Sequence, residues 1–187
     1  MAYQFKIQLM NVSKPPVWRQ IQVPESITFH DLHNLIQLVF GWEDCHFYQF
    51  SPKGYGSHPT IAIPSKEDWE ETDMKSKKTK LNKVFTIQNQ TFNYLYDFGD
   101  DWSHKITFEK LVPEDIKLPV CLNGKGACPP EDCGGPWGFE NMKIILADPT
   151  HDEYQDMKDW LGLDEDEFWD ANSFDIAEVN ELLKGFK

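Results

Sequence analysis

The sequence predicts an α+β protein in which a mostly antiparallel sheet is followed by a run of acidic amphipathic helices. Strand-like segments and one helical segment fill residues 1–120, and from residue 136 the apolar residues recur at helical spacing. With 187 residues, 40% of them hydrophobic, the chain can bury one sizeable core. We therefore expect a single domain over 1–187, with a Cys/Gly/Pro-rich loop at 121–135 between a sheet part and a helical part at 136–187.

The N-terminal part reads as a hairpin followed by a helix. Residues 3–9 alternate between apolar and polar side chains, and a second strand is predicted over 17–23. The helix predicted over 28–40 has Thr28 as its N-cap and ends at Gly41. A hairpin, a helix and further strands suggest a β-grasp-like start.

His30 and His33 lie three residues apart in this helix, as a ligand pair would. No apolar face claims them, which instead favours exposed polar side chains.

Short strands are predicted next over 45–51 and 60–64, and residues 65–80 are predicted to form a polar excursion. The segments 91–98 and 102–111 then form a hairpin, joined by a turn of Gly99, Asp100 and Asp101.

The last third of the chain predicts four helical stretches. They cover 137–147, 151–162, a short acidic one at 164–169, and a last one that begins at Ser173 or Asp175. Their acidic residues lie opposite the apolar stripes, so we expect these helices to pack on one side of the sheet.

The charge distribution argues against a nucleic-acid partner. Residues 131–187 carry 16 acids and 4 lysines, which accounts for most of the net charge of −13, and Arg19 is the sole arginine. A basic cluster at 75–83 leaves nucleic-acid binding as a lesser alternative. The chain has no apolar run long enough to cross a membrane and no signal-like start, so we expect a cytoplasmic protein without a membrane partner.

The cysteine-rich loop has three interpretations. Cys121, Cys128 and Cys133 could converge on zinc, with His104 or His46 as a fourth ligand, although the paired C-x-x-C spacing of most structural zinc sites is absent. Compact cysteines could instead simply pack the loop. A catalytic cysteine needs a nearby positive charge or helix N-terminus, and only Cys133 has a claim to one.

A second candidate site is the hairpin end YDFGDDWSH, which holds Asp97, Asp100 and His104. With Glu131 and Asp132 of the PPED segment, such carboxylates could bind zinc or another divalent metal and activate water. Asp and Gly are also what a tight turn requires, and the turn is the favoured explanation for any one of these acids.

Aromatic residues suggest a third interpretation, a groove for a peptide or small ligand. It would be lined by Trp42, His46, Tyr48 and Trp137, although most of the tryptophans should lie in the core.

Four segments together resemble the Ri-plasmid open-reading-frame-three-like family of small microbial proteins. They are VWRQIQVP, TFHDLHNLIQLVFGWEDCHFYQF, YLYDFGDDWSHKITFEK and CLNGKGACPPEDCGGPWGFENM. The family brings no accepted catalytic residues. The resemblance directs attention to one shared site, composed of His46, Asp97, Asp100, Trp102, His104, Glu131 and Asp132.

We expect a binding or accessory protein whose ligand is a protein or small molecule. A metal-dependent hydrolase or nuclease is the alternative. Both require the hairpin end and the PPED segment to meet in space.

Overall fold

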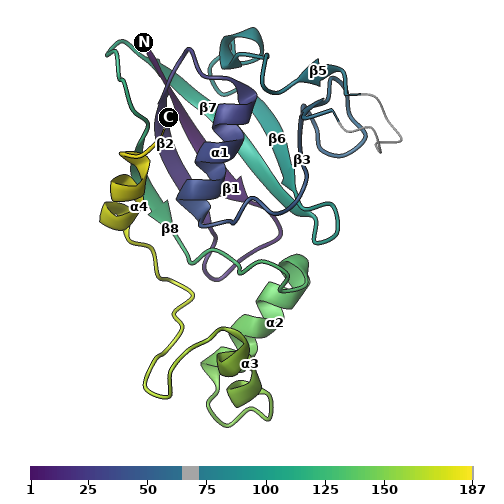
Figure 1. Cartoon of the computed structure of the whole chain (residues 1–187), viewed down its shortest axis with the longest axis vertical. Coiled ribbons are helices and arrows are strands. Elements are labelled where there is room, and N and C mark those ends of the chain that lie inside the picture. Colours follow the sequence, from purple (N-terminus) through teal and green to yellow (C-terminus); the bar gives the residue numbers. More distant parts are fainter. Residues whose placement is uncertain (65–71, 187) are drawn as a thin grey trace.

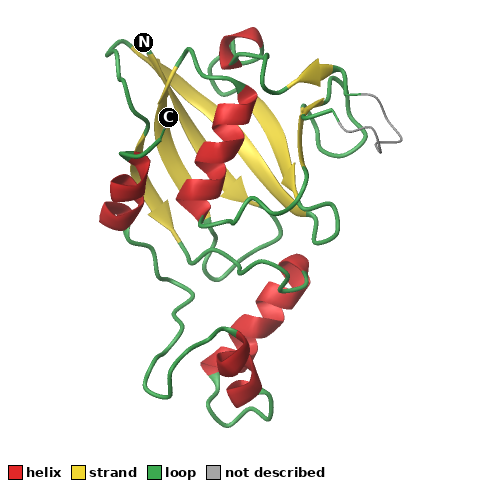
Figure 2. Cartoon of the chain, viewed as in Figure 1, coloured by secondary structure: helices red, strands yellow, loops and turns green. Residues whose placement is uncertain are grey.

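The computed structural model describes residues 1–64 and 72–186, and these form the predicted α+β fold (Figures 1 and 2). One sheet contains eight strands in the order β5-β4-β3-β6-β7-β1-β2-β8, all antiparallel except the β4/β5 pair. The strands are β1 (Ala2–Leu9), β2 (Trp18–Pro24), β3 (Tyr48–Ser51), β4 (Ile61–Ala62), β5 (Met74–Lys75), β6 (Thr91–Tyr96), β7 (Trp102–Val112) and β8 (Val120–Lys125).

The start of the chain is the predicted hairpin and helix. β1 and β2 pair antiparallel, and Phe5, opposite Ile21, is fully buried because the alternation puts the apolar side chains on one face. Helix α1 (Phe29–Phe40) crosses that face of the sheet (Figure 1). Thr28 and Asp31 form a capping box, and Gly41 ends the helix with φ 91°.

His33 in α1 is buried, which corrects the expectation of an exposed side chain. It is 1% exposed and stacks on Tyr48 of β3 at 3.6 Å between ring centroids. His33 precedes Ile36 and Gln37 by one helical turn, so it lies on the flank of the apolar stripe and faces the sheet.

The predicted polar excursion at 65–80 lies partly outside the described residues, because 65–71 are not described. Its later part forms β5 and leads into a 3₁₀ turn, η1 (Leu81–Lys83). Between β5 and η1, Ser76 and Thr79 are buried.

The segment 121–135 is not all loop, because β8 includes its first five residues and pairs with β2. Cys121 is buried opposite Ile21, so the cysteine fills an inward strand position. On the outer edge of β8, the Asn180 side chain accepts the Cys121 N–H and donates to the Cys121 carbonyl.

Three helices follow β8, but they do not form one layer on the sheet. Helix α4 (Ile176–Leu183) lies against β8 and α1, whereas α2 (Gly135–Ala147) and α3 (Tyr154–Trp160) pack on each other beyond the end of the sheet (Figure 1). Phe139 and Met142 of α2 are buried, and Phe139 packs edge-on against Trp169 in the segment between α3 and α4. The predicted helix at 164–169 is absent, since its like-charged acids achieve only a single turn, Glu167 N–H to Asp164 O.

The main core lies between α1 and the sheet and is rich in aromatic rings. Phe5, Phe29, Phe50 and Phe85 are at most 1% exposed and contact one another edge-on or stacked. Among the described residues, no helix has the length and apolar character needed to span a membrane.

Candidate metal centre

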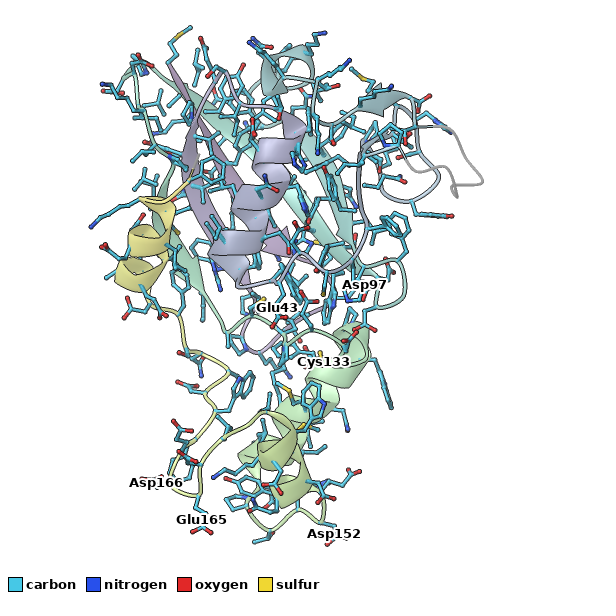
Figure 3. All side chains as sticks on the ribbon, in the orientation of Figure 1. Glu43, Asp97, Cys133, Asp152, Glu165 and Asp166 are labelled. Carbon is cyan, nitrogen blue, oxygen red and sulfur yellow. The ribbon has the colours of Figure 1, made fainter. Side chains whose placement is uncertain are left out.

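The hairpin end between β6 and β7 meets the loop that precedes α2. The Gly134 N–H donates to Asp100 Oδ2 (3.2 Å), and the Tyr96 hydroxyl donates to Glu131 Oε1 (2.9 Å). Figure 3 shows Glu43, Asp97 and Cys133 in this junction between sheet and α2, far from the acids at the end of the α2–α3 lobe. The two segments that the sequence singled out are therefore adjacent.

Four side chains converge there, which we call the His46 cluster: His46, Asp97, Glu131 and Asp132. His46 Nε2 lies 3.5 Å from Asp132 Oδ1, 3.6 Å from Asp97 Oδ2 and 3.8 Å from Glu131 Oε2. Among the described residues, His46 is the only basic partner of these three carboxylates. Three negative charges thus face one imidazole nitrogen.

Two atoms of the cluster are buried and make no hydrogen bond within the described part of the chain, His46 Nε2 and Glu131 Oε2. Buried polar atoms are nearly always paired, so each orphan requires a physical explanation. The other oxygen of Glu131 accepts two hydrogen bonds, from the Glu43 N–H (2.8 Å) and from Tyr96. One oxygen therefore fixes the carboxylate and the other is left facing His46.

Asp97 follows the same pattern. Its Oδ1 accepts the Gly99 N–H at 2.8 Å, while Oδ2 points at His46. Its backbone has φ 53°, a left-handed conformation that Asp tolerates better than most residues. Asp132 also has positive φ, but its side chain is 77% exposed, so the cluster opens to solvent on that side.

Burial raises the pKa of the Tyr96 phenol, and the hydrogen bond to Glu131 raises it further. The phenol therefore stays protonated and donates to Glu131. The Cys45 N–H in turn donates to the Tyr96 oxygen at 3.1 Å. Tyr96 thus connects the segment before His46 to the carboxylate opposite it.

The possible ligand atoms form two triads that share His46, one with Asp97 and Asp132 and one with Cys45 and Glu131, and the atoms of each triad lie within 4.8 Å of one another. Zinc binds nitrogen and oxygen at about 2.0–2.2 Å, so ligand atoms around a tetrahedral ion are about 3.3–3.6 Å apart. The three distances from His46 Nε2 are in or just above this range. Cys45 is within ligand spacing of His46 and Glu131, but desolvation raises the pKa of its thiol, so it would lose its proton only on binding the metal. Sequence reasoning did not include Cys45 in its ligand set, although its position next to His46 was a usable signal.

The other residues of the predicted ligand site have different surroundings. Asp100 is at the junction and holds the first turn of α2 through Gly134. Trp102 and His104 are completely buried in β7, beside Trp42. Burial lowers the pKa of His104 to about 4, so it is a neutral core side chain.

The predicted metal set of Cys121, Cys128, Cys133 and His104 is not brought together as a ligand group among the described residues. Burial raises the pKa of all three cysteines, that of Cys133 to about 12 with Asp100 contributing. These sulfurs are therefore thiols at neutral pH. At Cys133 burial and then Asp100 raise the thiol pKa despite the nearby start of α2, so this residue is not a thiolate nucleophile.

The predicted aromatic groove is only partly assembled. Trp42 and Tyr48 are buried in the core, whereas Trp137 is 83% exposed on α2. A pocket of about 480 Å³ does lie beside the cluster, between residues 44–47 and 97–99, and the exposed rings of Phe47 and Phe98 line it.

The basic cluster at 75–83 runs from the end of β5 through the following turn to η1, and it contributes no residue to the pocket or the His46 cluster.

The fold and this junction define a class: a single-sheet α+β protein whose histidine–carboxylate cluster joins the sheet to a helical lobe. The chain belongs to the plasmid pRiA4b ORF-3-like protein family, whose model matches residues 1–178.

Two relatives share nearly the whole chain. The uncharacterized protein y4hQ of Sinorhizobium fredii (strain NBRC 101917 / NGR234) is 32% identical over 182 residues, which cover 96% of this chain and 89% of that protein. The crystal structure of MM3350, a protein of unknown function from Methanosarcina mazei Go1, superposes with a TM-score of 0.81 at 38% identity, and covers 95% of this chain and 96% of that one. Both printed descriptions leave function open.

Proposed function

We propose that this protein binds one divalent metal ion through His46, Asp97, Glu131 and Asp132, and that the ion forms part of a ligand site. The observation that carries the proposal is that two buried atoms, His46 Nε2 and Glu131 Oε2, lie 3.8 Å apart and neither makes a hydrogen bond within the described part of the chain. A cation between them would satisfy both atoms and compensate the carboxylate charges.

Zinc or manganese suits the donors better than magnesium. An imidazole nitrogen is a good ligand for zinc, and a nearby thiol such as Cys45 adds a soft donor, whereas magnesium prefers oxygen and water. The pocket lined by Phe47 and Phe98 lies directly beside the ligands, so a small molecule or an extended peptide segment could reach the ion.

Metal-dependent hydrolysis is the second candidate. The exposed side of the cluster at Asp132 supports it, because an ion there could keep a water molecule as a further ligand and lower its pKa. Turnover of activated ester or phosphodiester substrates by the zinc-loaded protein, abolished by chelation, would distinguish this activity from binding alone.

The first test is calorimetric titration of chelator-treated protein with Zn²⁺ and Mn²⁺. We expect one ion per chain, and we expect His46→Asn to weaken binding at least about a hundredfold, because a direct ligand should matter no less than its supporting residues. His151→Asn, outside the cluster, is the matched control and should bind like the original chain. Absence of stoichiometric binding, or equal affinity in His46→Asn, would refute the proposal.

A further inference from the structure

The segment that carries Cys45 and His46 is held by its backbone amides. Three consecutive backbone N–H groups donate to side chains. The Glu43 N–H donates to Glu131, the Asp44 N–H to Gln37, and the Cys45 N–H to Tyr96. Two of these acceptors belong to the junction already described. The third, Gln37, belongs to α1 and leads into the core.

Asp44, Gln37, Tyr94 and His33 form a closed hydrogen-bonded ring. The Asp44 N–H donates to Gln37 Oε1 at 2.8 Å, and Gln37 Nε2 donates to the Tyr94 hydroxyl at 2.9 Å. Tyr94 Oη lies 2.8 Å from His33 Nδ1, and His33 Nε2 lies 2.8 Å from Asp44 Oδ1. The ring thus begins and ends on residue 44.

Asp44 fixes the direction of the two bonds that it makes. A backbone N–H can only donate and a carboxylate can only accept, so His33 carries a proton on Nε2. In a neutral imidazole Nδ1 then has no proton, and the Tyr94 hydroxyl donates to it. Burial supports this assignment: it lowers the pKa of His33 to about 4 and raises that of Tyr94, so the imidazole is neutral and the phenol protonated.

Three members of the hydrogen-bonded ring lie in the core. His33, Gln37 and Tyr94 are at most 4% exposed, and the His33 ring is stacked on Tyr48. Asp44 itself is half-exposed, has φ 55°, and borders the pocket next to Cys45. The hydrogen-bonded ring therefore ties Asp44, a loop residue in a sparsely populated backbone conformation, to side chains of the core.

We propose that His33, Gln37 and Tyr94 are positioning residues for the metal centre: by fixing Asp44 on both its amide and its carboxylate, they set the place of Cys45 and His46. This inference rests on the proposed metal binding. Residues that orient metal ligands through hydrogen bonds commonly change metal affinity 10- to 100-fold when replaced.

The test compares Tyr94→Phe with Tyr48→Phe. Each change removes one buried hydroxyl and keeps the aromatic side chain. The Tyr48 hydroxyl, however, bonds to His30 and Ser76 and is not part of the hydrogen-bonded ring. We expect Tyr94→Phe to lower Zn²⁺ affinity about tenfold or more, while Tyr48→Phe leaves it unchanged. Urea unfolding of both metal-free variants shows whether they lose similar stability.

The outcomes separate the two proposals. If the original chain binds no metal, the proposed function fails and this inference with it. If it binds metal and Tyr94→Phe binds equally well, or both variants weaken binding alike, the positioning role alone is refuted. Nitrogen-15 NMR of the original chain gives a check that needs no variant: His33 should be neutral with its proton on Nε2, and a proton on Nδ1 would overturn the inference.

Discussion

His33 and His104 are buried imidazoles whose surroundings favour the neutral form. Burial lowers both pKa values to about 4 from the ordinary 6.5, with the Asp44 carboxylate opposing the effect at His33, and His104 Nδ1 hydrogen-bonds to the Trp102 carbonyl. In the unfolded chain both would titrate near 6.5. Between these values the unfolded state binds more protons than the native state.

We therefore predict that the metal-free protein loses stability as the pH falls from 7 to 4.5. The stability is fully present above pH 6.5 and decreases toward pH 4, with each histidine contributing up to about 1.4 kcal/mol per pH unit inside this window. Urea unfolding at several pH values measures the slope. His104→Gln should reduce this slope by up to about 1.4 kcal/mol per pH unit, the contribution of one proton. A free energy of unfolding that does not depend on pH would contradict the prediction.

At the residue scale, the sequence indicated the members of the His46 cluster but not the hydrogen-bonded ring that lies behind it. His46, Asp97, Glu131 and Asp132 were all candidates, because acids and histidines grouped at turns are visible in the sequence. The ligand set built from Cys121, Cys128, Cys133 and His104 failed to assemble, since spacing along the chain does not reveal which strand positions face inward. The hydrogen-bonded ring joins residues up to 61 apart and could not be read from local patterns.

The start of α2 is the element on which the junction depends. Gly135 has φ 67°, and a Cβ there would lie 2.5 Å from the Asp100 carbonyl oxygen. Gly162 has nearly the same φ, 68°, with nothing within 4 Å of a Cβ. The two glycines share one backbone conformation and differ only in what surrounds them.

This pair gives a matched prediction. Gly162→Ala should lower the free energy of unfolding by about 1 kcal/mol, the cost of the left-handed conformation. Gly135→Ala should lose about 2 kcal/mol or more beyond that, because α2 must move away from the hairpin end. Chemical denaturation measures both. Equal losses would show that the α2–hairpin contact is not tight.

Element prediction succeeded where one face is clearly apolar and failed where the pattern was short. The β1/β2 hairpin, α1 and the β6/β7 hairpin have strong periodicity and were placed correctly. Asn123 and Gly124 made β8 look like a loop, because this strand is stabilised by pairing with β2 rather than by its own composition. At 164–169 the acidic turn signals were mistaken for a helix start.

At the scale of the whole molecule, Arg19 joins parts that are distant in the sequence. Its guanidinium is buried and donates to the carbonyls of Trp18, Val39, Lys125 and Gly126, so it connects β2, α1 and the end of β8. Phe174, in the segment between α3 and α4, stacks on it at 4.1 Å. The sole arginine is therefore a structural clamp.

We predict that Arg19→Lys lowers the free energy of unfolding by about 3 kcal/mol or more, since one ammonium cannot satisfy four carbonyls arranged around a planar fork. Lys125→Gln, an exposed neighbour, should change it by less than about 0.5 kcal/mol. Limited proteolysis should also cut Arg19→Lys faster within 161–175, where Phe174 loses its support. Unchanged cleavage and stability would show that the clamp is dispensable.

The sequence could not foresee how the C-terminal helices are distributed. Their apolar stripes predicted burial, but not that α2 and α3 would pack on each other while α4 packed against β8 and α1. Such choices depend on contacts between distant segments, such as Asn180 with β8, that no local pattern encodes.

That last contact has a consequence for how copies of the protein meet at high concentration. An outer strand with free amides and carbonyls is a template onto which a neighbour's strand can add. The carboxamide of Asn180 already occupies both backbone groups of Cys121, in the manner of a strand one residue long. A single side chain thereby closes that position to the growth of a continuous intermolecular sheet.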